Sequence, residues 1–238
     1  MNNFENISWN VPDSVKILVT KKNFSYQNDF NISFSGENSY KETKKNIDFL
    51  INNFLPSKPY FIKQAHGKKI INLNENTLLP YVADGLITKK RNQVISILTA
   101  DCMPIVISSI CGSIVCILHV GRKGAEFNII KNAFNFLSDH SYSYEAWIGP
   151  SISKSYYLVN ENIRKRFVSL NKKYEEFFFK SNDNLHMDLS GIATFQLKEN
   201  NVDNIYYSNL CTFNNYKELY SFRKFSDFKR FGTFVWIE

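Results

Sequence analysis

The feature that most constrains the fold is a series of short segments in the middle of the chain, most of them rich in Val and Ile. They cover residues 94–98, 104–108, 113–119 and 145–148. Each is short, and polar or turn residues separate them, a pattern that favours buried strands over helices. Residues 15–20 and 59–64 have a similar composition, and residues 216–223 and 232–237 are expected to form closing strands. These segments predict a core built on β-sheet.

Helical segments are interspersed with these predicted strands. Residues 160–170 and 189–200 are helix candidates, and residues 40–54 and 123–137 carry apolar side chains at helical spacing. Those side chains are Ile47, Leu50, Ile51 and Phe54 in the first segment, and Phe127, Ile130, Phe134 and Leu137 in the second. No regular βαβ rhythm, repeat or linker divides the 238 residues. The sequence therefore predicts one α+β domain with mixed sheets over residues 1–238.

Charge and cysteine content exclude several classes of protein. The formal net charge is +7, but the basic residues are scattered and do not alternate with aromatic residues along one stripe. We therefore expect no nucleic-acid partner, while a basic pocket for a phosphate-using substrate fits this charge. The apolar region 94–120 is interrupted by Asp101 and Pro104, so it is not expected to cross a membrane. Four cysteines without paired spacing, and no signal sequence, predict reduced thiols, a cytoplasmic location and no obligate protein partner.

Three residues with metal-binding side chains lie near predicted strand ends. His66 precedes a glycine in QAHGKK, Cys102 lies in TADCMP, and His119 ends the apolar run SIVCILH. Two imidazoles and one thiolate suit zinc, and three protein ligands leave a fourth position open for catalysis. The spacing matches no short metal motif, so alternatives stay open at this point. Cys102 could be a small buried apolar residue, or a nucleophile with His119 as its base in a metal-independent hydrolase.

The order of motifs resembles that of the YfiH-like family, also called the laccase-domain or multicopper polyphenol oxidase family. The matching segments are QAHG at 64–67, DGLIT at 84–88, TADCMP at 99–104, HVGRKG at 119–124, IGPSI at 148–152 and LCTFNNYKELYSFRK at 210–224. The resemblance covers nearly the whole chain. It implies a four-layer α/β/β/α sandwich with mixed sheets and a zinc site formed by His66, Cys102 and His119.

The resemblance also implies an activity on purine nucleosides. Family members are described as cleaving adenosine, inosine and methylthioadenosine with phosphate, and as deaminating adenosine. Candidate contacts to phosphate or substrate are Lys21, Arg122, Lys123, Arg223 and Arg230, and Asp101 is a candidate for proton transfer beside Cys102. Solvated surface charge is the alternative interpretation for each basic residue, and a polar turn residue is the alternative for Asp101.

The family name raises the question of copper. The same three ligands could take copper, but four histidines in the chain cannot supply both a blue-copper centre and a trinuclear cluster. A full multicopper oxidase is therefore excluded. The family's relation to cysteine hydrolases keeps the Cys102 hydrolase open, and a zinc-stabilised binding or peptidoglycan-precursor editing protein of low activity is a further alternative.

The chain departs from the family pattern next to the predicted site. Arg122 and Lys123 stand where the family has Trp and Arg, and Lys224 replaces a second arginine. A lysine cannot reproduce the bidentate contacts of a guanidinium group. We therefore expect the metal ligands to be retained and the substrate contacts to be altered.

Overall fold

Two β-sheets form the centre of the computed structural model, which describes residues 4, 7, 9–23, 25–35, 40–73, 82–137 and 142–238. The first sheet is antiparallel in the order β1-β11-β4, with β1 (Val15–Val19), β11 (Phe231–Ile237) and β4 (Ile95–Thr99). The second sheet is mixed, in the order β10-β7-β5-β6-β3-β2. Its strands are β10 (Ile205–Tyr207), β7 (Tyr144–Ile148), β5 (Met103–Ser109), β6 (Val115–Val120), β3 (Gly85–Thr88) and β2 (Ile70–Asn72).

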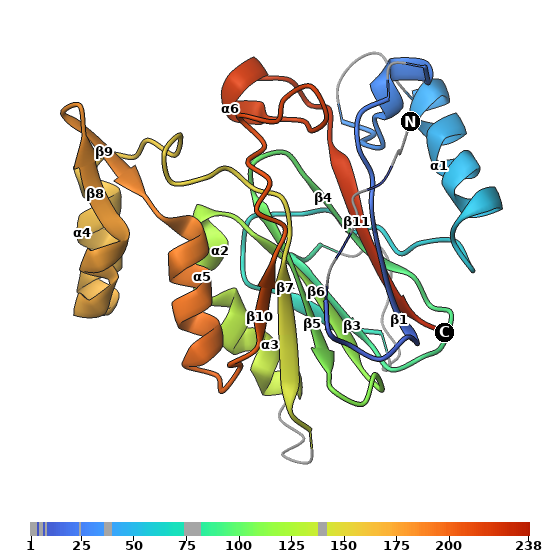
Figure 1. Ribbon diagram of the computed structural model, residues 1–238, viewed down its shortest axis with the longest axis horizontal. Helices are drawn as coiled ribbons and strands as arrows, with labels where there is room; N and C mark the ends of the chain where they lie inside the picture. The colour runs from blue at the N-terminus through green and yellow to red at the C-terminus, as the bar shows by residue number, and fades with distance from the viewer. Residues whose placement is uncertain are drawn as a thin grey trace.

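Helices cover the outer faces of both sheets (Figure 1). α1 (Tyr40–Asn53) packs on the antiparallel sheet through Ile47 and Leu50. α2 (Arg122–Glu126), α3 (Ile129–Leu137) and α5 (Leu189–Lys198) pack on the mixed sheet. A third apolar cluster, which includes Ile97, Val106 and Val235, fills the space between the two sheets. Three apolar clusters between four layers give the expected α/β/β/α sandwich with mixed sheets.

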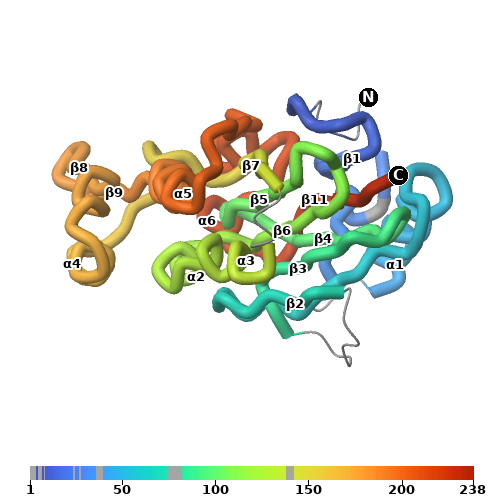
Figure 2. Tube along the Cα trace, turned by 90° about the horizontal axis from the view of Figure 1, so that it is seen from below, coloured from blue at the N-terminus to red at the C-terminus, as the bar shows by residue number. Residues whose placement is uncertain are grey.

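A smaller substructure stands beside α5, away from the two sheets (Figures 1 and 2). It consists of α4 (Glu161–Leu170), the 3₁₀ helix η2 (Lys172–Phe177) and a hairpin of β8 (Phe178–Ser181) and β9 (Asn184–Met187). Asn160 caps α4, since its side chain accepts a hydrogen bond from the backbone N–H of Ile163. The sequence predicted α4 but gave no signal for the two short strands, nor for β2, β3 and β10.

Two predicted strands are wrong. Residues 59–64 form only isolated bridges, Tyr60 with Ile95 in one sheet and Lys63 with Val82 beside the other. Because the segment passes from one sheet to the other, it cannot build a ladder with either. Residues 216–223 form turns that lead into α6 (Phe222–Phe225), which begins where the Ser221 hydroxyl accepts a hydrogen bond from the N–H of Lys224.

The single helix predicted for residues 123–137 is also wrong, because α2 and α3 are separated at Phe127 and Asn128. Asn128 has a φ of 52°, and its side-chain oxygen accepts a hydrogen bond from the N–H of Lys131 at 3.0 Å. This local bond offers the backbone an alternative to continuing the helix. Ile130 and Leu137 are buried as expected, whereas Phe127 is 50% exposed. Within the described part of the chain, no helix has the length and hydrophobicity needed to span a membrane.

Candidate metal centre

The pairing of β5 with β6 brings Cys102 to His119. Pro104 lies opposite His119 in this antiparallel register, so Cys102, which precedes β5, reaches the end of β6. Gly121 then gives the thiol its space, because a Cβ atom on this residue would lie 2.8 Å from Cys102 Sγ. A side chain at position 121 would therefore displace the thiol.

His66 lies on a turn that is organised by the carboxylate of Asp84. Asp84 Oδ1 accepts a hydrogen bond from the N–H of His66 at 2.9 Å. Asp84 Oδ2 accepts from the N–H groups of Gly67 at 2.7 Å and Ala65 at 3.2 Å. These three bonds hold His66 with a φ of 57°, in the left-handed region that non-glycine residues seldom adopt. The sequence prediction placed His66 at a strand end, but its position depends on this loop and its carboxylate.

Asp84 also orients the second histidine. Its Oδ1 lies 2.8 Å from Nδ1 of His119, and both side chains are almost fully buried. With Nδ1 engaged, Nε2 of His119 is the nitrogen available to a metal ion, an arrangement typical of metal-binding histidines. The rings of His66 and His119 lie 4.7 Å apart between centroids, at 75° to one another.

The structure therefore brings together the three side chains that the sequence singled out. His66, Cys102 and His119 each offer one ligand atom, and these atoms lie within 4.8 Å of one another. The group could hold a metal ion. Two imidazole nitrogens and one thiolate fit zinc, and three ligands leave one position of a tetrahedron open. His186 lies elsewhere, with Nδ1 near the carbonyl oxygen of Lys154 and the ring stacked on Phe179.

The electrostatics of the centre favour a thiolate. Burial raises the pKa of Cys102, but the charge of His119 and hydrogen bonds from both histidines outweigh it and lower the pKa to about 6. Burial lowers the pKa of His119, but Cys102 and Asp84 raise it to about 9. The pKa of Asp84 lies below its usual value, since the bonds from His119 and Gly67 outweigh the effect of burial. The ionised thiol and carboxylate are the forms that bind or support a metal ion.

Two of the predicted phosphate contacts, Arg122 and Arg223, lie around Tyr157. Burial raises the pKa of Tyr157 to about 12, with a contribution from Cys102, while Arg122 and Arg223 act in the opposite direction. The guanidinium group of Arg223 lies 5.2 Å from the centroid of the Tyr157 ring. Arg122 forms an ion pair with Glu126 at 3.2 Å. Tyr157, which the sequence analysis did not single out, thus links both arginines to the centre.

The other three predicted basic contacts occupy different settings. Arg230 is partly buried and lies within electrostatic range of Cys102 and Asp101, and its burial lowers its pKa. Lys21 forms an ion pair with Glu218 at 2.8 Å, and Lys123 is exposed on α2. Arg122 and Arg223 thus act electrostatically on Tyr157 and Arg230 acts on Cys102, whereas Lys21 is paired with Glu218.

Asp101, the predicted proton-transfer residue, anchors the C-terminal segment beside the centre. Its Oδ1 accepts a hydrogen bond from the Thr212 hydroxyl, and its Oδ2 accepts one from the N–H of Arg223, both at 2.6 Å. Asp101 itself has a φ of 88°. These contacts connect the segment around Cys102 to α6 and fix the position of Arg223.

Sequence reasoning missed Asp84 as a functional residue. It appeared only as the first residue of the DGLIT motif. Its distance along the chain from His66 and His119 gives no sign that one carboxylate supports both. The signal is its place in the motif together with its burial, since a carboxylate that is 1% exposed requires strong partners.

Comparison with known proteins supports the resemblance. The family described as multi-copper polyphenol oxidoreductase laccase matches residues 18–238. A protein of Rickettsia conorii named purine nucleoside phosphorylase is 33% identical over 173 residues, covering 71% of this chain and 72% of the relative. A Haemophilus influenzae protein of the same name is 27% identical, with 98% of each chain covered.

Solved structures share the fold. A Neisseria meningitidis protein superposes with a TM-score of 0.88 at 21% identity, covering 100% of both chains. The Bacillus licheniformis hypothetical protein YfiH has a TM-score of 0.82 at 20% identity, covering 94% of this chain and 93% of the other. The expected YfiH-like fold is therefore confirmed. Together with the match over residues 18–238, these likenesses show that the chain belongs to the YfiH-like, laccase-domain family described as multi-copper polyphenol oxidoreductase laccase.

Proposed function

We propose that this protein is a zinc-dependent purine nucleoside phosphorylase with an accessory adenosine deaminase activity. The observation that carries the proposal is the centre of His66, Cys102 and His119, whose ligand atoms lie within 4.8 Å and whose second histidine is oriented by Asp84. The naming of relatives as purine nucleoside phosphorylases supports the substrate class. Adenosine, inosine and methylthioadenosine are the proposed substrates, and the products of phosphorolysis are the free base and the sugar 1-phosphate.

The ligand residues define what the centre contributes. Bound zinc would act as a Lewis acid and would lower the pKa of water in its open position for deamination. Cys102 supplies a thiolate at neutral pH, because its pKa is about 6. Asp84 keeps the proton of His119 on Nδ1, so that Nε2 faces the other two ligands.

The surrounding residues supply substrate binding in this proposal. Arg122, Arg223 and Arg230 would hold phosphate by charge and hydrogen bonding, which places it for attack on the anomeric carbon of the sugar. Tyr157 keeps its phenolic proton at neutral pH, because its pKa is raised to about 12, and it can donate a hydrogen bond to a substrate oxygen. Asp101 holds Arg223 at the start of α6 through a hydrogen bond from its backbone N–H. In this proposal, Asp101 transfers a proton from the same position.

The experiment measures zinc content and release of free base from adenosine, with and without phosphate, for the wild type and Cys102→Ala. Exposed Cys111→Ala serves as the matched control. We expect one zinc per chain and phosphate-dependent release of adenine in the wild type and in the control, and loss of both in Cys102→Ala. Wild-type protein that binds no zinc would refute the ligand assignment. Zinc binding without turnover of any nucleoside would refute the phosphorylase and favour a binding or precursor-editing role.

A metal-independent hydrolase is a second candidate, and one observation favours it. Cys102, His119 and Asp84 form a relay in which the thiol is hydrogen-bonded to the imidazole and the carboxylate lies 2.8 Å from its Nδ1. This is the arrangement of a nucleophile, a base and an orienting group. Activity that survives complete chelation of metal but is lost on alkylation of Cys102 would establish this candidate and overturn the first.

A further inference from the structure

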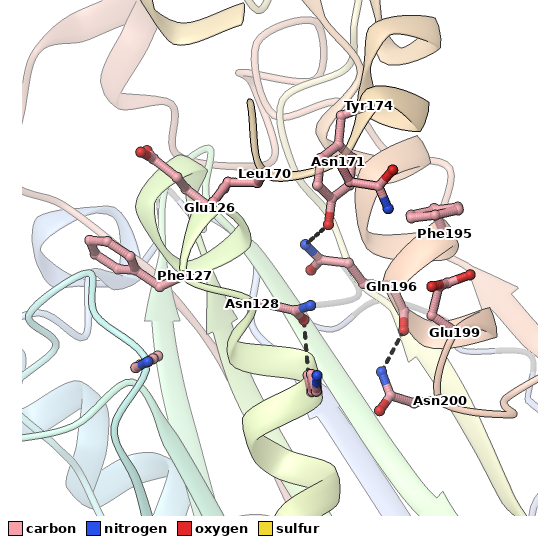
Figure 3. A pocket seen from close by; sticks show the side chains of 12 residues that line it. Glu126, Phe127, Asn128, Leu170, Asn171, Tyr174, Phe195, Gln196, Glu199 and Asn200 are labelled. Atoms are coloured by element: carbon pink, nitrogen blue, oxygen red, sulfur yellow. Dashed lines mark hydrogen bonds between the residues drawn. The ribbon is translucent and has the colours of Figure 1, made fainter. Parts of the chain in front are cut away.

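A cavity lies between the helices that cover the mixed sheet and the smaller substructure of α4 and η2. It has a volume of about 530 Å³ and is lined by the ends of α2, α4 and α5, the start of α3 and η2, together with Lys68. Figure 3 shows its labelled side chains arranged around the opening. The volume lies within the range of small-molecule sites in proteins. None of the residues in the candidate metal centre lines this cavity.

A buried amide at the wall of the cavity has an acceptor without a partner. Gln196 is 1% exposed, and its Nε2 donates hydrogen bonds to the carbonyl oxygen of Ala125 at 2.7 Å and to the Tyr174 hydroxyl at 2.9 Å. Its Oε1 has no hydrogen-bond partner among the described residues. The oxygen is enclosed by protein, so Gln196 shapes the wall by holding Tyr174 and the carbonyl group of Ala125 in place.

Within the part of the chain that the structure describes, three further amides have donors or acceptors left for a ligand. Asn128 and Asn171 use their side-chain oxygens to accept from backbone N–H groups, which leaves their NH₂ groups for other partners. Asn200 uses its NH₂ group on the carbonyl oxygen of Gln196, which leaves its oxygen. Side-chain amides of this kind match the alternating donors and acceptors on the edge of a nitrogen heterocycle.

The aromatic and charged residues define the ligand further. Phe127 is 50% exposed at the rim, and the rings of Tyr174 and Phe195 meet edge to face at 5.6 Å deeper in the wall. Flat heterocycles stack on such rings. Two lysines and two glutamates line the cavity, and one of the glutamates, Glu126, already pairs with Arg122. The lining thus favours neither an anion nor a cation.

We propose that this cavity is a binding site for a neutral nitrogen heterocycle of the nucleobase type, separate from the metal centre. The ligand lies against Phe127 and Tyr174 and meets the amides of Asn171 and Asn200 through its edge. The site exists because the chain breaks between α2 and α3. The turn at Asn128 places Phe127 at the rim instead of in the core.

The test uses a fluorescent reporter at the rim and adenine as the probe. Phe127→Trp places an indole on the cavity, and Phe136→Trp places one on α3 at a residue that is 43% exposed and does not line it. We expect saturable quenching by adenine of the first reporter and not of the second. Equal quenching of both, no quenching at millimolar adenine, or stronger quenching by ribose than by adenine would overturn the proposal.

Two sets of variants in the Phe127→Trp background locate the site. Asn171→Ala and Asn200→Ala should each raise the Kd for adenine about fivefold, the effect of one neutral hydrogen bond, while exposed Asn162→Ala should not change it. Unchanged binding in both amide variants would refute the recognition. Cys102→Ser should leave the quenching intact, and loss of quenching there would assign adenine to the metal centre instead. Because the readout needs no turnover, failure of the proposed phosphorylase leaves this result unaffected.

Discussion

The substitution Asp84→Asn tests whether one carboxylate organises the whole metal centre. Asparagine keeps the shape of the side chain but replaces one acceptor oxygen by a donor. If the NH₂ group takes the place of Oδ2, it faces the N–H groups of Gly67 and Ala65. If it takes the place of Oδ1, it faces the N–H of His66 and Nδ1 of His119, which forces the His119 proton onto Nε2. In either orientation the new NH₂ group faces backbone N–H donors. In the second orientation, the proton on Nε2 of His119 also blocks the metal-binding nitrogen.

The expected magnitude follows from these contacts. Loss of an orienting partner typically lowers metal affinity about 10- to 100-fold, which corresponds to about 1.4–2.8 kcal/mol. At least two charge-assisted hydrogen bonds are lost, so we expect the free energy of unfolding of the metal-free protein to fall by about 3 kcal/mol. In a chain of this size, such a loss lowers Tm by on the order of 10 °C.

Competition with a chromophoric chelator measures the zinc affinity, and thermal unfolding of the metal-free protein measures the stability. Asp48→Asn is the matched control. Asp48 forms an exposed ion pair with Lys44 on α1, so this substitution should change neither quantity by more than about 1 kcal/mol. If folded Asp84→Asn binds zinc as tightly as the wild type, Asp84 does not set the His119 tautomer and the reasoning fails.

Three further predictions concern the same region. Gly121→Ala has an allowed backbone, with φ of −89°, but its Cβ would lie 2.8 Å from Cys102 Sγ. Zinc affinity should therefore fall at least about tenfold with no loss of helix content by circular dichroism, and an unchanged affinity would contradict this contact. In metal-free protein, Cys102 should react with iodoacetamide with a midpoint near pH 6, since its lowered pKa gives the thiolate above that pH. Mass spectrometry of the modified peptide checks this, and a midpoint near pH 9 would show that the histidines do not stabilise the thiolate. Asp101→Ala should lower the free energy of unfolding in urea by about 3 kcal/mol, and Thr212→Val, which removes one of its two partners, by about 1 kcal/mol. Equal losses would show that the bond to Arg223 contributes nothing.

Several elements of the fold could be predicted because their signals are local. The Val- and Ile-rich segments that became β4, β5, β6 and β7 are buried, and their composition alone indicates strands. α1 and α5 follow from apolar spacing. One wrong strand prediction has a cause that lies outside the segment itself. Residues 59–64 have strand-like composition, but their neighbours belong to two different sheets.

The candidate metal ligands likewise combine a local signal in the sequence with contacts that exist only in the folded chain. Residue type and motif identified His66, Cys102 and His119 in the sequence, because thiolate and imidazole chemistry is a property of each side chain. Their meeting within 4.8 Å depends on the β5–β6 register and on the turn held by Asp84. The supporting roles of Asp84 and Tyr157 could not be predicted in this way, since hydrogen bonds and charge effects between residues far apart in the chain exist only in the folded state.

By itself, the sequence determined the residue chemistry and the sheet-based core, because these follow from side-chain type and short-range periodicity. Only the tertiary structure decided which carboxylate supports the two histidines and which arginines act on Tyr157. Each of these depends on distances between segments that packing brings together. Such distances are set by the balance of the whole core and not by any one stretch of the chain.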